Sequence, residues 1–392
     1  MPAFSPPLSA VSRRTALKSL GLLAGSGLLG LAPARAQTAA PRVDGNGDPL
    51  SARYPELNYI NLAGNENPFG PSRRVTMALM REAANSSRYP FREANILRDE
   101  IAALEDVPPD HILLGNGGDE VLAFAAAEYG HPGAEIVATK PTYLQLMDYA
   151  ERRGAKTRWV PTTGPDMRHD LDAMEAAVNG KTALVYVCNP DTPSGTMRAP
   201  ADIESFCRRV SERVPILLDE VYLDLLDDFA QQTQTALVRE GLPVLICRSF
   251  SKLHALAGHR IGYLIGPPEI LQGLQAHRMS GLNYLGVACA RESLRDTAFH
   301  TLSRRSIRAG RAALEALLDE LALPFIPSHG NFVFHYTGTP VREFQDFMRE
   351  RRLFVGRPFP PYEDWVRISI GLPAEMAVYE RALREWHSAR DA

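Results

Sequence analysis

The sequence predicts an α/β protein with a mostly parallel central sheet and a smaller α+β domain at its carboxyl end. Before residue 285, short apolar segments alternate with amphipathic helical segments, which is the pattern of a parallel sheet with helices on both faces. Beyond it, a long helical segment (299–321) is followed by a strand, a helix and a strand. With 392 residues, 45% of them hydrophobic, the chain is long enough for both domains. We therefore expect a large domain at 73–285 and a small domain at 286–392.

The first 36 residues differ from the rest of the chain. Arg13 and Arg14 precede an apolar, glycine-rich segment (20–31), and a small-x-small cleavage site follows at 34–36. The pattern resembles a twin-arginine export signal. The alternative is a membrane anchor, but the apolar segment is shorter than the ~20 residues that a spanning helix needs. We expect residues 1–36 to be a cleaved signal read by the twin-arginine export machinery, and the protein to be periplasmic or extracytoplasmic without a permanent membrane anchor.

Charge and cysteine content narrow the functional classes. A net charge of -3 with both signs mixed predicts no basic surface, so nucleic acid is a poor candidate partner. The four cysteines, at 188, 207, 247 and 289, show no C-x-x-C spacing, which argues against a metal site. They also do not resemble the dense disulfide framework of a small secreted domain. We expect buried free thiols.

The segment 37–72 is predicted to be an amino-terminal arm followed by a loop that lines a substrate site. Residues 37–57 are polar and rich in glycine and proline. Residues 61–72 hold too many turn residues for a helix or a strand. A helix is expected at 73–84. The segment 88–90 that follows should be extended, because the residue before a proline avoids the helical region.

A phosphate-sized anion site is predicted where a strand meets a helix. Residues 112–114 read as a strand, 115–118 as a glycine turn, and 120–129 as a helix with an acidic first turn. The free amides and the positive dipole end of this helix attract anions, and the glycines allow close approach. The G-x-G-x-x-G spacing of a dinucleotide site is absent, so a mononucleotide-sized phosphate fits better.

Polar and aromatic residues follow several of the predicted buried strands. These are Tyr143 after 135–139, Asn189 after 183–188, Asp219 and Tyr222 after 216–218, and Lys252 after 244–247. Because ligands of parallel sheets gather at the carboxyl ends of strands, we expect Asn189, Asp219, Tyr222 and Lys252 to converge. Tyr143 is either a ring that stacks on a planar ligand or a core tyrosine.

Lys252 is the most reactive residue of this set. A lysine at a strand end beside apolar neighbours is partly desolvated, which lowers its pKa and favours the neutral amine that forms an imine with an aldehyde. Ser249, Ser251 and Arg260 could hold a phosphate beside it. The alternative is that Lys252 and Arg260 only solvate a strand end.

The combination of an acid at a strand end, a hydroxyl three residues later and a lysine 33 residues after the acid predicts pyridoxal 5′-phosphate as the cofactor. The lysine forms the Schiff base, the carboxylate keeps the ring nitrogen protonated, and the phosphate donors anchor the other end.

At these residues the chain resembles the fold-type I pyridoxal-phosphate-dependent aminotransferases, and within them the histidinol-phosphate aminotransferase group. The resemblance covers nearly the whole chain after residue 36. It is carried by the segments 65–71, 88–90, 115–120, 189–195, 219–222, 249–262 and 367–371. It implies a three-layer transferase fold and a homodimer with shared active sites.

The resemblance also implies a role for each site residue. The catalytic residues would be Lys252, Asp219 and Tyr222. The cofactor would be held by Gly117, Gly118, Asp119, Tyr143, Asn189, Asp219, Tyr222, Ser249, Ser251, Lys252 and Arg260, with Tyr89 reaching it from the neighbouring subunit. The substrate would be held by Asn67, Arg357 and Arg367, with Arg367 clamping the α-carboxylate.

The implied reaction is transfer of an amino group between a small α-amino acid, or an amino-alcohol phosphate, and a 2-oxo acid. The segment 355–361 departs from the family pattern for the substrate's distal group, and export makes histidinol phosphate an improbable substrate. Decarboxylation or elimination on the same scaffold is the first alternative. A protein that holds the cofactor or a solute without catalysis is the second.

Overall fold

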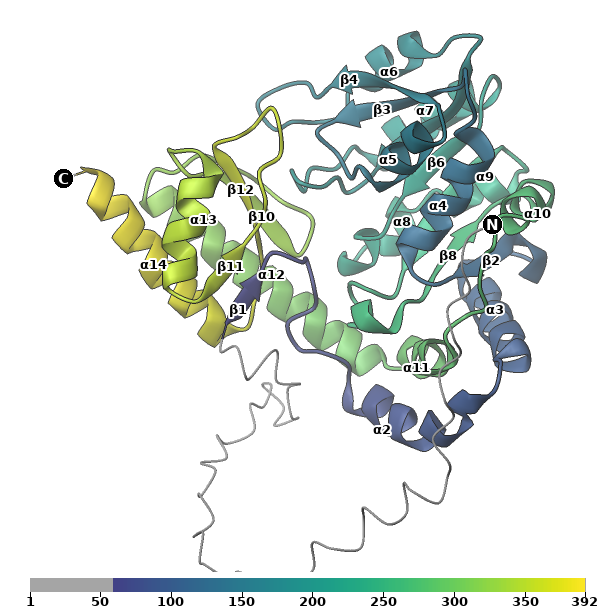
Figure 1. Cartoon of the computed structure of the whole chain (residues 1–392), viewed down its shortest axis with the longest axis horizontal. Helices are drawn as coiled ribbons and strands as arrows, with labels where there is room; N and C mark the ends of the chain where they lie inside the picture. Colours follow the sequence, from purple (N-terminus) through teal and green to yellow (C-terminus); the bar gives the residue numbers. More distant parts are fainter. Residues whose placement is uncertain (1–58, 392) are drawn as a thin grey trace, which may run out of the picture. The chain divides into compact units, whose positions relative to one another are not determined.

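The computed structural model describes residues 59–391, and the predictions for 1–36 and for the arm up to residue 58 lie outside them. A seven-stranded sheet forms its centre, with strand order β2-β8-β7-β6-β5-β3-β4 (Figure 1). The strands are β2 (Ile112–Gly115), β3 (Glu135–Lys140), β4 (Lys156–Pro161), β5 (Thr182–Cys188), β6 (Ile216–Asp219), β7 (Val244–Ser249) and β8 (Gly262–Ile265). Only β8 runs against its neighbours β2 and β7. The prediction of a mostly parallel sheet is confirmed.

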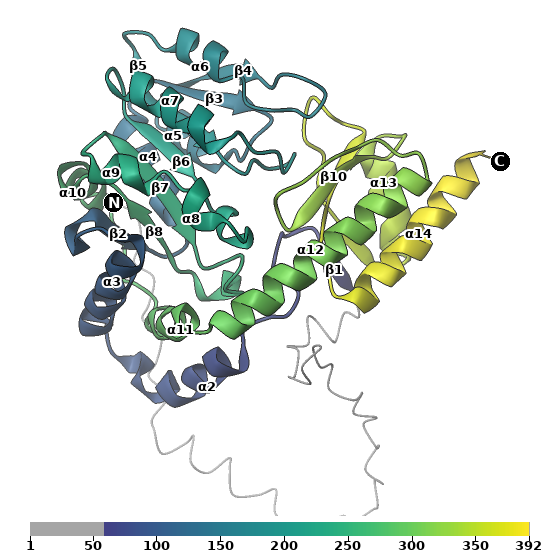
Figure 2. The same cartoon turned by 180° about the vertical axis from the view of Figure 1, so that it is seen from behind.

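Helices cover both faces of this sheet, which gives three layers (Figure 2). One layer consists of α4 (Gly118–Tyr129), α5 (Gln145–Arg152) and α10 (Pro268–Gln275), which pack on one apolar face. The other consists of α2 (Arg73–Glu82), α3 (Phe91–Glu105), α6 (Leu171–Ala177), α7 (Pro200–Ser211), α9 (Thr235–Arg239) and α11 (Tyr284–Leu294). Because side chains alternate along a strand, β6 gives Leu217 to the first face and Ile216 and Leu218 to the second.

The carboxyl-terminal part has its own sheet and core. Strands β12 (Trp365–Ser369), β10 (Phe332–Tyr336) and β9 (Phe325–Ile326) form an antiparallel sheet in that order. Apolar residues of α12 (Thr297–Glu320), α13 (Val341–Glu350) and α14 (Pro373–Asp391) pack with it into a separate hydrophobic cluster. The strand, helix and strand expected in this region are present.

The loop expectation for 61–72 is wrong at its start. Ile60–Leu62 forms the short strand β1, which pairs in parallel with β11 (Leu353–Val355). Three residues followed by glycine and asparagine give no local strand signal, and the partner lies far away in the sequence. In addition, α4 begins at Gly118, before the predicted start, and α2 ends at Glu82, where a 3-10 turn (Ala83–Ser87) takes over.

All four cysteines are free and buried, which confirms the prediction of buried thiols. Among residues 59–391, no helix combines the length and the apolar character that crossing a membrane requires.

Candidate active site

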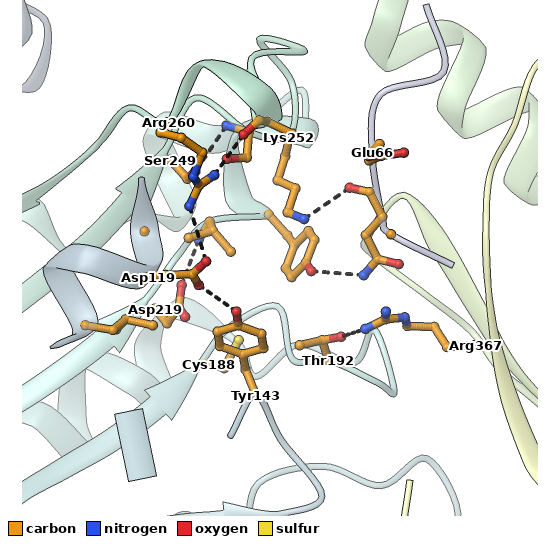
Figure 3. Close-up of a pocket in the computed structure, with 18 residues that line it drawn as sticks. Glu66, Asp119, Tyr143, Cys188, Thr192, Asp219, Ser249, Lys252, Arg260 and Arg367 are labelled. Atoms are coloured by element: carbon orange, nitrogen blue, oxygen red, sulfur yellow. Dashed lines mark hydrogen bonds and ion pairs between the residues drawn. The ribbon is translucent and has the colours of Figure 1, made fainter. Parts of the chain in front are cut away.

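A cavity of about 270 Å³ lies at the carboxyl ends of β5, β6 and β7, and it also borders the loop after β1 and the strand β12 (Figure 3). The predicted site residues that line it are Gly118, Asp119, Tyr143, Asp219, Tyr222, Ser249, Ser251, Lys252, Arg260 and Arg367. These residues come from elements far apart in the sequence, so the fold brings them together as the strand-end argument predicts.

The lysine side chain extends into this cavity. Its Nζ donates to the carbonyl oxygen of Asn65 at 3.1 Å and lies 5.2 Å from the ring centroid of Tyr222. The side-chain amide of Asn65 in turn donates to the Tyr222 hydroxyl at 2.9 Å. Asn65 therefore orients both Lys252 and Tyr222. We did not predict this role from the sequence, because Asn65 lies in a loop that shows only turn residues.

Asp219 is the last residue of β6 and is 1% exposed. Its carboxylate accepts from the Tyr186 hydroxyl at 2.8 Å and from the backbone amide of Val221 at 3.3 Å. Burial raises the pKa of Asp219 to about 6, although these two hydrogen bonds oppose the rise. Tyr186 was also missed, because a tyrosine within an apolar strand reads as a core residue.

The opposite end of the cavity can hold a phosphate. Gly117 has a φ of 91°, and a Cβ there would lie 2.2 Å from the Arg260 guanidinium. The first amides of α4, which begins one residue later, have no partner within the helix. Ser249, Ser251 and the Arg260 guanidinium line the same cavity. These groups are the donor set that a doubly charged phosphate needs.

A chain of hydrogen bonds joins this end to the aromatic wall. Arg260 donates to the Asp119 carboxylate at 3.2 Å and to the Ala257 carbonyl at 2.8 Å. Asp119 also accepts from the Tyr143 hydroxyl at 2.6 Å (Figure 3). Burial, and then the Asp119 carboxylate, raise the pKa of Tyr143, which keeps the phenol protonated. The Tyr143 ring is thus fixed at the cavity wall.

Arg367 is a partly buried cation, and not all of its N–H donors have partners. Its guanidinium donates to the Thr192 hydroxyl and to the Ala63 carbonyl, both at 2.9 Å, and its Nε has no partner among the described residues. It stands 5.5 Å from the Phe332 ring centroid and 5.2 Å from that of Phe359. Burial lowers its pKa. A planar guanidinium that lines a cavity and has unpaired donors can bind a carboxylate through two parallel hydrogen bonds.

The structure does not bring every predicted residue to the cavity wall. Asn189 accepts from the Arg198 amide at 2.8 Å, beside Cys188, which does line the cavity. Asn67 donates to the Leu253 carbonyl at 2.9 Å and the Ser303 hydroxyl at 3.0 Å, so its amide supports the Lys252 loop from behind.

Arg357 and Tyr89 are both exposed, away from the cavity wall. The Arg357 guanidinium lies 4.2 Å from the ring centroid of Phe359. Tyr89 is 75% exposed. In a single chain, therefore, Tyr89 does not reach the cavity.

Residues 58–383 match the family described as aminotransferase class I and II. The chain belongs to this family. A histidinol-phosphate aminotransferase of Moorella thermoacetica is 34% identical over 86% of this chain and 89% of that protein. Histidinol-phosphate aminotransferase 1 of Cupriavidus pinatubonensis is 35% identical over 84% of this chain and 89% of that protein.

Solved structures agree with this assignment. A histidinol-phosphate aminotransferase from Sinorhizobium meliloti, crystallised in complex with pyridoxal 5′-phosphate, superposes with a TM-score of 0.78. It is 28% identical, and the match covers 84% of this chain and 91% of that one. This chain is a pyridoxal-phosphate-dependent aminotransferase.

The residues of this aminotransferase fit the cofactor. Gly118, Ser249 and Arg260 supply donors for a phosphate, Asp219 supplies a buried carboxylate for the ring nitrogen, and Lys252 supplies an amine in the same cavity. When bound, pyridoxal phosphate supplies an aldehyde that captures amines and a ring that delocalises the electron pair left when the substrate loses its α-proton.

Proposed function

We propose that this aminotransferase moves an amino group between a small α-amino acid, or an amino-alcohol phosphate, and a 2-oxo acid. The observation that carries the proposal is the meeting of Lys252, Asp219 and Arg367 at one cavity. Lys252 would carry the proton to and from the substrate's α carbon, since its Nζ lies within the cavity. Arg367, which lines the same cavity, would hold the α-carboxylate through its guanidinium. Asp219 would keep the cofactor ring charged.

The identity of the substrate's distal group is part of the proposal. The relatives named above are histidinol-phosphate aminotransferases. Arg357 lies near the same Phe359 ring as Arg367, at 4.2 Å and 5.2 Å from its centroid, respectively, so it is a candidate cation for a distal anion. The proposed export separates this chain from histidine biosynthesis in the cytoplasm, so we favour a substrate other than histidinol phosphate.

A substrate screen tests the proposed reaction. The purified protein starting at Gln37 is incubated with pyridoxal phosphate, single amino acids or histidinol phosphate, and a panel of 2-oxo acids. We expect the loss of one amino donor to match the gain of one new amino acid, and the Lys252→Ala variant to show neither. Release of carbon dioxide or of ammonia without amino transfer would instead identify a decarboxylase or a lyase.

We further propose that residues 1–36 direct export by the twin-arginine route. The support is Arg13 and Arg14 before a short apolar segment and a small-x-small site. Replacing both arginines by lysine should leave the precursor in the cytoplasm, and a protein that starts at Gln37 should no longer appear outside it. Unchanged processing of the lysine variant would contradict this route.

Assembly as a homodimer with shared sites completes the proposal. Tyr89 and Phe91 are each 75% exposed, and their rings lie 5.6 Å apart. Met77 and Met80 of the nearby helix α2 are exposed as well. An exposed group of large apolar side chains is typical of a surface that another subunit covers. In such a dimer the Tyr89 hydroxyl would donate to the cofactor phosphate of the partner's site.

A further inference from the structure

A cluster of charged side chains is buried directly behind the cavity, on the opposite face of the central sheet. Glu220 follows Asp219 at the end of β6, and Arg248 precedes Ser249 at the end of β7. Asp219 and Ser249 line the cavity. Successive side chains along a strand alternate between the two faces of the sheet. Glu220 and Arg248 therefore point away from the cavity that Asp219 and Ser249 line.

Glu220 and Arg248 form an ion pair that is withdrawn from water. Arg248 is 4% exposed and Glu220 is 3% exposed, and Nη2 of the arginine lies 2.9 Å from Oε2 of the glutamate. Glu220 also accepts from the Thr233 hydroxyl at 3.0 Å and from the backbone amide of Gln234 at 3.2 Å. Burial raises the pKa of Glu220, and the Arg248 charge opposes this rise. A second acid, Glu105 of α3, lies 3.8 Å from Arg248.

Stability alone does not account for this pair. Removing two charges from water costs about as much as their attraction returns, so buried ion pairs contribute little net stability, and apolar replacements are often neutral. A buried ion pair can instead serve to hold the two segments that carry it in one relative position. The Glu220–Arg248 pair stands where the ladder of β6 and β7 ends, just beyond the backbone bond from the Glu220 amide to the Cys247 carbonyl at 3.1 Å.

We propose that Glu220 and Arg248 are positioning residues of the aminotransferase. Their ion pair fixes the end of β6 to the end of β7, and thereby fixes Asp219 relative to the loop that carries Lys252. The inference rests on the proposed function, in which Asp219 and Lys252 act on the same cofactor. Neither Glu220 nor Arg248 touches the cavity, so they act through their neighbours.

The geometry makes this spacing sensitive. Asp219 lies at the last rung of the ladder, whereas Lys252 lies three residues beyond the end of β7 in a loop whose Ala255 has a φ of 59°. A shift of the end of β6 relative to the end of β7 would therefore move Asp219 without moving Lys252 by the same amount. Misplacement of a reacting group by about 1 Å can cost up to roughly 100-fold in rate.

Replacing Glu220 by glutamine tests the proposal, because the variant keeps the size of the side chain and one acceptor but removes the charge. We expect kcat to fall about tenfold while KM stays within about twofold. The dissociation constant of pyridoxal phosphate, titrated without substrate, should rise by a similar factor. The Glu220→Asp variant keeps the charge and should recover part of both losses.

Glu105→Gln is the matched control, since it removes a buried glutamate beside the same arginine, but from α3. We expect a lower melting temperature with kcat and cofactor affinity close to those of the wild type. A Glu220→Gln protein with wild-type kcat and cofactor affinity, whatever its melting temperature, overturns the proposal. So does an equal loss of kcat in Glu105→Gln, because the cluster would then act only through general stability.

Two further measurements separate the remaining cases. If Glu220→Gln does not fold, Arg248→Lys replaces it, since this variant keeps the charge and loses the planar fork. The same fall in kcat is then expected, and a wild-type kcat overturns the proposal.

If the wild-type protein transfers no amino group in the substrate screen, the proposed function fails. The cofactor titration of the Glu220 variants still tests whether the ion pair positions Asp219 and the Lys252 loop.

Discussion

At the scale of single residues, Asp219 meets two opposing requirements. Its role beside the cofactor ring needs a negative charge, whereas burial raises its pKa from 3.8 to about 6. Between these two pH values, Asp219 is therefore protonated in the folded, cofactor-free protein and ionised in the unfolded chain. The contribution of Asp219 to stability should decrease as the pH rises through this window, by about 3 kcal/mol. The buried Asp219 carboxylate that the cofactor needs therefore destabilises the cofactor-free protein near neutral pH.

The Asp219→Asn variant tests this conflict. In the cofactor-free state at pH 7 it should melt roughly 5 °C above the wild type, because asparagine leaves no charge buried at this position, and the difference should vanish near pH 4. Calorimetry at several pH values measures both. The same variant should retain the cofactor but lose turnover by several orders of magnitude. Equal melting temperatures at pH 7 would contradict the stability argument, and near-normal turnover would remove Asp219 from its role.

The site residues that the sequence did not indicate share one physical cause. Tyr186, Asn65 and Thr192 act through hydrogen bonds to Asp219, Lys252 and Arg367, respectively. Each of these bonds joins segments far apart in the sequence, so no local pattern reports it. Lys252 and Asp219 themselves could be predicted, because their chemistry and their strand-end positions are local properties.

At the scale of elements, the turn between β2 and α4 fits tightly against Arg260. A side chain at Gly117 would need a positive φ and would also displace the guanidinium. Gly133 has a similar φ of 88°, but nothing lies within 4 Å of a Cβ added there. The two glycines therefore separate the backbone cost from the effect on the anion site.

We expect Gly117→Ala and Gly133→Ala each to lose about 1–3 kcal/mol of stability, because both positions have a positive φ that alanine adopts only at a cost. Only Gly117→Ala should also weaken the binding of pyridoxal phosphate, by roughly tenfold or more, because an arginine displaced from a phosphate loses a charge-assisted bond. Titration of both variants with the cofactor measures this. Equal affinities would show that the turn does not set the position of Arg260.

The elements themselves were predicted unevenly. The buried strands β5, β6 and β7 have continuous apolar sequences and strong turn signals after them, so their positions could be read from the sequence. The strands β1, β9 and β11 have two or three residues each. Strands this short exist only through their partners, and neither propensity nor alternation can indicate them.

At the scale of the whole molecule, the position of Tyr89 separates a monomer from a shared-site dimer. Tyr89→Phe should weaken the affinity for pyridoxal phosphate by roughly ten- to a hundred-fold while leaving the fold intact, since one hydrogen bond to a charged acceptor is lost. Mixing Tyr89→Phe subunits with inactive Lys252→Ala subunits gives mixed dimers. One site of each then carries both changes and the other carries neither.

Activity in the mixture should therefore recover towards half of the wild-type value. Subunit exchange is verified with a mass or affinity label on one of the two variants. No recovery after verified exchange, or a mature protein that sediments as an active monomer, rules out the shared site.

The pairing of β1 with β11 has a consequence for how the protein is made. Ile60 lies beside Leu353 in this pair, so nearly 300 residues separate the two partners in the chain. At about 5–20 residues per second, a ribosome needs roughly 15–60 s between them. During that time the large domain can fold, but β1 cannot pair, because its partner strand β11 has not yet been synthesised. Under the proposed export route, which carries folded proteins, this late pairing delays departure until synthesis is almost complete.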